Sequence, residues 1–210
     1  MKSFDKIFFG FILGFTFPFL LCLLSMIIWF YFDKSESRVF IYLGTGLLIG
    51  LIIDLKFLKS WINKRYELAI WFIIFIYLIY NIGIYGFFMG FPVFNVLLGL
   101  VAGYYFGKRI CFGNIESEKH SKFINQVSLF TGLIMTLICI SSGFLALAGA
   151  GAGGDIKGML GLSFEVTKSM VFGITLIGGL SLILTQIILT RITMIKTIKI
   201  NTRLIRANQQ

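Results

Sequence analysis

Three amide side chains lie inside otherwise apolar stretches of the chain, and they are its first candidates for chemistry: Asn81, Asn95 and Gln186. Polar groups are costly at membrane depth, so those found in an apolar stretch are candidates for function. Asn81 and Asn95 flank a predicted turn, whereas Gln186 lies in the last apolar stretch. The sequence allows two roles for these amides: they form hydrogen bonds between helices, or they line a polar cavity for a solute.

A second group of candidates lies in the segment 148–170, which begins with a run of Gly and Ala and continues with charged residues. Glu165 and Lys168 are three residues apart and would share one face of a helix. We therefore consider Asp155, Glu165 and Lys168 as candidate gate residues over an outward-facing cavity. A solvated loop and a re-entrant segment, whose backbone would need protein or water around it, are the alternatives.

Several kinds of catalytic and metal site are excluded by residue type. His120 is the only histidine, so haem held by two histidines and metal sites built on histidine pairs are excluded. The three cysteines show no Cys-x-x-Cys spacing, which argues against structural zinc and against a disulfide framework. The Gly-x-Ser-x-Gly motif of serine hydrolases does not occur. We expect no metal and no cofactor.

Two short motifs bear on a hydrolase alternative. The run Gly153-Gly154-Asp155-Ile156-Lys157 resembles the Gly-rich aspartate motif of prepilin peptidases and presenilin-type membrane aspartyl proteases, although Ala152 departs from the Gly-x-Gly-Asp pattern. Asp54-Leu55-Lys56 resembles the first aspartate motif of prepilin peptidases. The resemblance implies two aspartates that share a proton and therefore touch. Three predicted spans separate Asp54 from Asp155, which places these two residues on opposite membrane faces.

The composition of the chain indicates the class of protein to which these residues belong. Of the 210 residues, 58% are apolar and 13% are charged, whereas an average soluble domain is about 25% charged. Such a chain cannot cover itself with polar surface in water, and its 17% aromatic content argues against disorder. We predict an all-α, polytopic integral membrane protein.

Apolar runs of about 18 residues or more predict transmembrane helices. The sequence predicts a bundle of six, at about 7–32, 39–55, 68–86, 90–107, 125–147 and 170–190, followed by a basic amphipathic cytoplasmic tail at 191–210. Pro18 is expected to kink or tilt the first helix. The second run is short, and it spans the bilayer if Asp54 lies about one turn inside the boundary. The runs are continuously apolar and do not alternate, which disfavours a β-barrel.

The positions of the basic residues predict the orientation. With the N-terminus inside, the outer loops hold only Lys34, Arg38, Lys157 and Lys168 of the 19 basic residues, together with an equal number of acidic residues. Every inner segment is basic, as the positive-inside rule requires. Both termini are therefore predicted to face the cytoplasm from the cell membrane, which is the cytoplasmic membrane if the source is prokaryotic. This distribution accounts for the pI of 9.7 without nucleic acid.

Glycines four residues apart mark two predicted packing faces. Gly46 and Gly50 fall in the second predicted span, and Gly99, Gly103 and Gly107 fall in the fourth. Small residues at this spacing let helix backbones approach closely, either within one chain or between copies in a homo-oligomer. The other expected partners are the lipid bilayer itself and a membrane or cytoplasmic protein that docks on the basic cytoplasmic face.

These features favour a transport-related function: a permease, a channel or a membrane-embedded substrate-binding subunit for an unidentified small solute. The size and number of spans resemble those of the substrate-binding subunits of vitamin-uptake transporters, a resemblance of fold alone. One alternative is a non-catalytic subunit or assembly factor of a membrane complex. The other is a membrane-embedded, aspartyl protease-like hydrolase, and catalysis is favoured less than transport.

Overall fold

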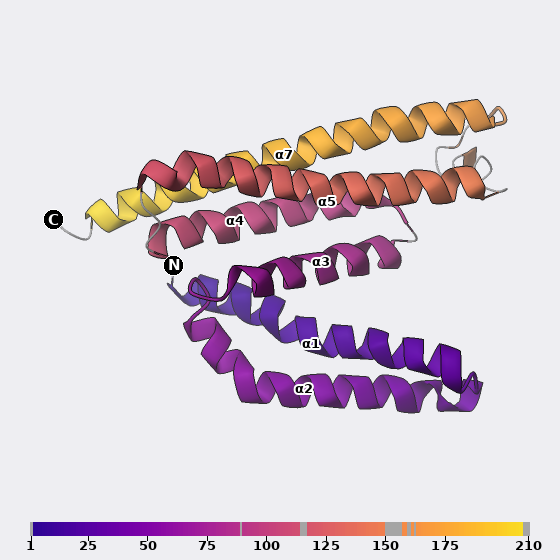
Figure 1. Cartoon of the computed structure of the whole chain (residues 1–210), viewed down its shortest axis with the longest axis horizontal. Coiled ribbons are helices and arrows are strands. Elements are labelled where there is room, and N and C mark those ends of the chain that lie inside the picture. The colour runs from indigo at the N-terminus through magenta and orange to yellow at the C-terminus, as the bar shows by residue number, and fades with distance from the viewer. Residues whose placement is uncertain are drawn as a thin grey trace. The chain divides into compact units, whose positions relative to one another are not determined.

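The long elements of the protein are all helices in a computed structural model, which describes residues 2–88, 90–113, 117–149, 157–158, 161 and 163–207. The described residues contain no β-strand, so the prediction of an all-α protein is confirmed. Figure 1 shows the long helices. Their bounds are α1 Lys2–Phe32, α2 Val39–Asn63, α3 Ile70–Phe87, α4 Leu97–Phe112, α5 His120–Ala148 and α7 Lys168–Ala207. Short 3₁₀ helices, η1 Glu36–Arg38, η2 Pro92–Val96 and η3 Ser117–Lys119, precede α2, α4 and α5.

Among the described residues, five helices are long and apolar enough to cross a membrane: α1, α2, α3, α5 and α7. The remaining long helix, α4, has 16 residues and begins later than the predicted span at 90–107. Pro92 gives the physical reason, because a proline disfavours helical backbone at the preceding residue and cannot donate a hydrogen bond. Phe91 is accordingly extended, and a 3₁₀ turn over Pro92–Val96 leads into α4.

The helices form two compact units, Met1–Tyr80 and Asn81–Gln210. In the first unit α1 and α2 pack as an antiparallel pair (Figure 1). Gly50 of α2 lies directly against the backbone of Pro18, and a Cβ placed on Gly46 would come within 2.5 Å of the Leu21 carbonyl oxygen. The pair continues well past residue 55, the predicted end of the second span, because Ile62 still packs against Gly10 of α1.

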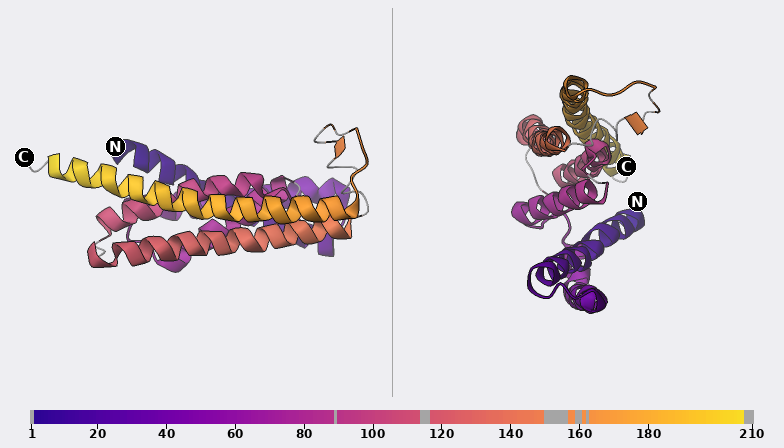
Figure 2. Two further views of the ribbon diagram at one scale, coloured as in Figure 1. Left: turned by 90° about the horizontal axis from the view of Figure 1, so that it is seen from above. Right: turned by 90° about the vertical axis from the view of Figure 1, so that its right-hand side faces the viewer.

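In the second unit α7 packs against both α4 and α5, and Figure 2 shows α5 and α7 running along each other. The apolar core of this unit joins Val96 to Met135 and Cys139 of α5, with three leucine and isoleucine side chains of α7 around them: Leu182, Ile183 and Leu189. The helix α7 runs without a break into the segment predicted as a tail. Its Met194 is fully buried, and Thr197 and Asn201 are also buried.

Candidate functional site

Asn81 and Asn95, which flank the connection between α3 and α4, meet in the structure. The side-chain nitrogen of Asn95 donates to the backbone oxygen of Asn81 over 2.8 Å and lies 3.2 Å from its side-chain oxygen. Both residues are buried, Asn95 completely. The contact holds η2 against the last turns of α3.

Gln186 belongs to α7, and it packs against α4 at Gly99, about one helical turn after Asn95. A Cβ placed on Gly99, four residues after Asn95, would lie 3.0 Å from both the Gln186 side-chain oxygen and the Thr190 hydroxyl. Gln186 and Thr190 are buried and are themselves four residues apart on α7. The missing side chain of Gly99 therefore leaves room for two polar groups of α7.

A third helix joins this arrangement through Thr131 of α5. Its hydroxyl lies 3.1 Å from the Thr190 hydroxyl and also donates to the backbone oxygen of Ser128. We call the five buried residues Asn81, Asn95, Thr131, Gln186 and Thr190 the polar cluster. It brings together the three amides predicted as candidates and adds two threonines that sequence analysis did not single out.

The polar cluster consists of neutral hydrogen-bonding side chains. Amides and hydroxyls both donate and accept hydrogen bonds, and none of the five side chains is charged at neutral pH. The side-chain oxygen of Asn95 is buried and has no hydrogen-bond partner among the described residues. His120, the only histidine of the chain, begins α5 and lies about 16 Å along the helix axis from Thr131, too far to act as its base.

The glycines of α4 hold α7 close on the same side as the polar cluster. A Cβ on Gly103 would lie 2.7 Å from the Thr190 carbonyl oxygen and 2.8 Å from Cβ of Thr193. One turn later, a Cβ on Gly107 would lie 2.8 Å from Cβ of Thr197. Glycine and threonine thus alternate across the α4–α7 contact, so the backbones of these helices are nearly touching.

The candidate gate residues have no such organisation. Asp155 lies outside the described residues. Glu165 is exposed and precedes α7, whereas Lys168 is the first residue of that helix, so the expected shared helix face does not form. The Thr167 hydroxyl explains the boundary, because it accepts a hydrogen bond from the Met170 amide and so caps the helix after Glu165.

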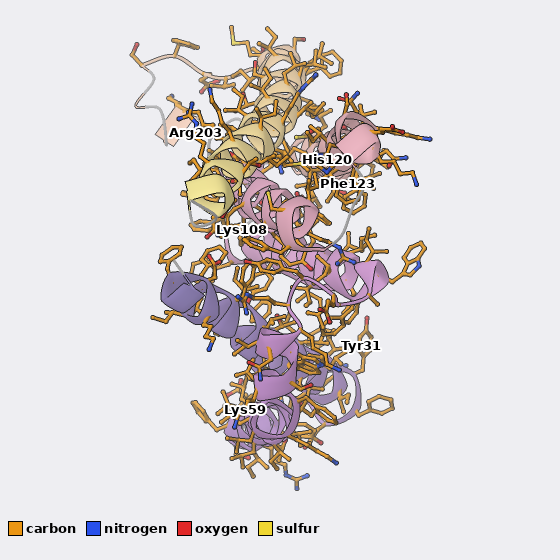
Figure 3. The ribbon with its side chains drawn as sticks, turned by 90° about the vertical axis from the view of Figure 1, so that its left-hand side faces the viewer. Tyr31, Lys59, Lys108, His120, Phe123 and Arg203 are labelled. Atoms are coloured by element: carbon orange, nitrogen blue, oxygen red, sulfur yellow. The ribbon has the colours of Figure 1, made fainter. Side chains whose placement is uncertain are left out.

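Lys108, near the end of α4, is a charged residue with unusual surroundings. Lys108 is 1% exposed, and its ammonium lies 5.5 Å from the ring centre of Tyr104 and 5.6 Å from that of Phe112. Figure 3 shows Lys108 on α4, with His120 and Phe123 together at the start of α5. The positive-inside pattern includes Lys108 among the inner basic residues, and its burial does not follow from that pattern.

The first unit contains a polar residue that sequence analysis underrated, Asp54. It is buried on the face of α2 that packs against α1, the same face that carries Gly46 and Gly50. The spacing of four residues from Gly46 to Gly50 to Asp54 was the signal that could have revealed this orientation. The hydrolase alternative would need a second carboxylate beside it, and Asp155 lies outside the described residues.

A hydrogen bond ties the connection between α2 and α3 to the start of α1. The Tyr66 hydroxyl donates to the Asp5 carboxylate over 3.1 Å, and the Arg65 guanidinium lies 4.8 Å from the Tyr66 ring centre. Burial, with a contribution from the Asp5 charge, raises the pKa of Tyr66. The phenol therefore remains a hydrogen-bond donor at every physiological pH.

No known protein family, curated protein or solved structure gives a significant match to this chain.

Proposed function

We propose that this chain is a multi-pass protein of the cell membrane that carries a small polar solute across it. Six crossings are supported by the lengths of the helices. Besides the five long apolar helices, η2 and α4 contribute 5 and 16 residues in succession. At roughly 2.0 and 1.5 Å per residue they extend about 34 Å, which suffices for about 30 Å of hydrocarbon.

Six crossings place both ends of the chain on one side, and the basic residues favour the cytoplasm for that side. Lys59 lies near the end of α2, and Arg203 lies on the last turns of α7 (Figure 3). Reporters fused to the two termini test this arrangement. We expect both to be active in the cytoplasm, and reporters in different compartments would contradict it.

The observation that carries the transport proposal is the unpartnered side-chain oxygen of Asn95 inside the polar cluster. A buried polar atom without a hydrogen bond is unfavourable by about 1–3 kcal/mol. Purely structural amides are expected to have all their hydrogen bonds made, as most buried polar groups do. A bound solute that donates a hydrogen bond would satisfy this oxygen.

The chemistry of the polar cluster indicates the class of solute. Its side chains are neutral, so they favour a small solute that is uncharged or zwitterionic and rich in hydrogen-bonding groups. Its residues come from η2 and from three long helices, α3, α5 and α7, so a shift of any one of them would open or close the site. Binding sites at interrupted helices near the membrane midplane are typical of transporters.

Uptake by proteoliposomes tests this function. Vesicles containing the protein are incubated with a defined mixture of neutral and zwitterionic metabolites, and their contents are then measured by mass spectrometry. We expect at least one solute to accumulate with the natural protein and not with Gln186→Leu. Ser141→Ala, at an exposed site on α5, is the matched control and should transport normally. Equal contents in all vesicles, including protein-free ones, would contradict the proposal.

The second candidate function is a subunit of a larger membrane complex, and the end of α7 favours it. Lys196, Lys199 and Arg203 are exposed there, while Met194 and Thr197 on the other side are buried. A basic surface of this kind suits an acidic partner or anionic lipid. The two functions are separable, because a subunit of this kind should tolerate Gln186→Leu but should fail when the close packing at Gly103 is disturbed.

A further inference from the structure

Asp54 is a carboxylic acid enclosed between two apolar helices. It is 5% exposed, and neither of its carboxylate oxygens has a hydrogen-bond partner among the described residues. It lies nine residues before the end of α2, which corresponds to about 14 Å along the helix. An acid at this depth of an apolar helix pair is a functional candidate because it is costly to keep there.

The polar groups around Asp54 are engaged elsewhere. The α1 residue opposite it is Gly14, on which a Cβ would lie 4.0 Å from Oδ2 of Asp54. The Thr16 hydroxyl on α1 and the Tyr80 hydroxyl on α3 both donate to the backbone oxygen of Ile12, over 2.8 and 2.7 Å. Both hydroxyls therefore satisfy a backbone oxygen and leave the carboxyl group without a donor.

No described cation compensates the charge that Asp54 would carry when ionised. On α1 the charged residues Asp5 and Lys6 lie toward the N-terminus, Asp5 about 14 Å along the helix from Gly14. On α3 the titratable residue that interacts with Asp54 is Tyr80. On α2 the nearest cation in sequence is Lys56, whose ammonium lies over the ring of Phe57. An unpaired carboxylate in such surroundings is strongly disfavoured relative to the neutral acid.

The neutral acid, in contrast, has a candidate acceptor on α1. Pro18 has no backbone N–H, so the carbonyl oxygen four residues earlier, at Gly14, lacks its usual helical donor. The same Gly14 is the residue opposite the Asp54 carboxyl group. The residue whose carbonyl oxygen lacks its helical donor is thus the α1 residue that lies opposite the Asp54 carboxyl group, which makes this oxygen the candidate acceptor for the O–H of the neutral acid.

From this juxtaposition we infer that Asp54 is a proton-binding site, which holds a proton while the carboxyl group is enclosed between α1 and α2 and releases it when the pair opens to water. Proton binding stands on the geometry alone. Its use to drive solute movement rests on the proposed function, and makes the protein a proton-coupled carrier.

Labelling with dicyclohexylcarbodiimide tests proton binding without any knowledge of the solute. This lipid-soluble reagent takes the proton of a carboxylic acid onto its nitrogen, and the carboxylate oxygen then adds to its central carbon. The full-length protein in vesicles is labelled between about pH 5 and about pH 9 and digested for mass spectrometry. We expect Asp54 to be labelled at acidic pH, with labelling falling as the pH rises.

Three variants and one internal control make the result decisive. Asp54→Glu should keep the label, whereas Asp54→Asn should lose it, and Glu36, exposed before α2, should remain unlabelled. Pro18→Ala restores the missing N–H and should shift the loss of labelling to lower pH. Absence of the label at acidic pH in folded protein, or labelling that is equal at every pH, would overturn the inference.

The same vesicles separate this inference from the proposed function. A protein whose Asp54 is labelled but which accumulates no solute retains the proton site and loses the transport proposal. A second outcome is that Asp54→Asn accumulates solute normally and that neither this variant nor the natural protein responds to an imposed pH gradient. This outcome overturns proton coupling and leaves the transport proposal intact. If accumulation depends on the pH gradient in the natural protein but not in Asp54→Asn, the result supports both proton coupling and the transport proposal.

Discussion

The side-chain nitrogen of Asn95 lies 2.8 Å from the backbone oxygen of Asn81 and donates a hydrogen bond to it. This bond links the 3₁₀ turn before α4 to the end of α3 and places an amide at the edge of the polar cluster. The 3₁₀ turn that precedes α4 therefore also supplies the buried amide of Asn95.

Asn95→Ala removes this bond and should destabilise the protein by about 1 kcal/mol, because a buried backbone oxygen loses a donor. The measurement is the thermal unfolding midpoint in detergent. Ser141→Ala removes an exposed hydroxyl that bonds only within its own helix over 3.0 Å, and it should leave the midpoint nearly unchanged. Equal midpoints for the two variants would show that the Asn95 contact contributes nothing.

Gly103→Ala should destabilise the contact between α4 and α7. The added Cβ would lie 2.7 Å from the Thr190 carbonyl oxygen, a backbone atom that cannot move without shifting α7. Overpacking of this kind typically costs about 1–3 kcal/mol. Gly178→Ala is the control, because nothing lies within 4 Å of its Cβ and alanine favours a helix. A loss of stability that is the same at both positions would refute the packing argument.

Gly50→Ala should separate α1 from α2, because the new Cβ meets the backbone of Pro18. A native probe reports on this contact: the Cys22 thiol of α1 lies 3.6 Å from the Leu43 carbonyl oxygen of α2. N-ethylmaleimide should modify Cys22 several times faster in Gly50→Ala than in the natural protein. Gly44→Ala, where the Cβ would meet nothing within 4 Å, should react at the natural rate, and identical rates in all three proteins would contradict the prediction.

Stability should fall at alkaline pH through Tyr66. Burial raises the pKa of this phenol in the folded protein, so above about pH 10 the unfolded chain loses the proton that the folded chain keeps. Folding is then increasingly disfavoured as the pH rises, and the contribution is fully present at lower pH. Unfolding midpoints measured across this range should fall more steeply for the natural protein than for Tyr66→Phe. Parallel curves would show that Tyr66 titrates as it does in water.

Sequence reasoning reached the helical class and the residue types of the site because both depend on local features. Continuous apolar runs specify long helices, and amides in such runs are unusual wherever they fall. The sequence also marked Gly99, Gly103 and Gly107 as one face. It could not identify Thr190 and Thr197 as the residues opposite, because that choice depends on how α7 is rotated and on its register along α4.

The features that sequence reasoning missed depend on packing in three dimensions. Asp54 is followed by Lys56 and Lys59, which predicts that the span ends near residue 55, whereas α2 continues to Asn63. Pro92 belongs to the group of helix breakers that predicts a turn here, but the predicted span begins at residue 90, whereas the effect of Pro92 on the preceding residue delays α4 to Leu97. The helical pattern of the tail predicts that it continues the last helix, as α7 does. The burial of Thr197 and Asn201 after Arg191 could not be read from hydropathy, because both residues are polar.

The central claim is that the polar cluster lies on a path that opens to water, and substituted-cysteine accessibility tests it most directly. Thr190→Cys is introduced after the native cysteines, Cys22, Cys111 and Cys139, are replaced by Ala, and the protein in vesicles is treated with a charged methanethiosulfonate. Leu137→Cys, at a residue of α5 that is 54% exposed on the apolar surface, is the control. The account predicts that Thr190→Cys reacts while Leu137→Cys does not. Protection of both thiols under every condition of pH and solute would contradict it.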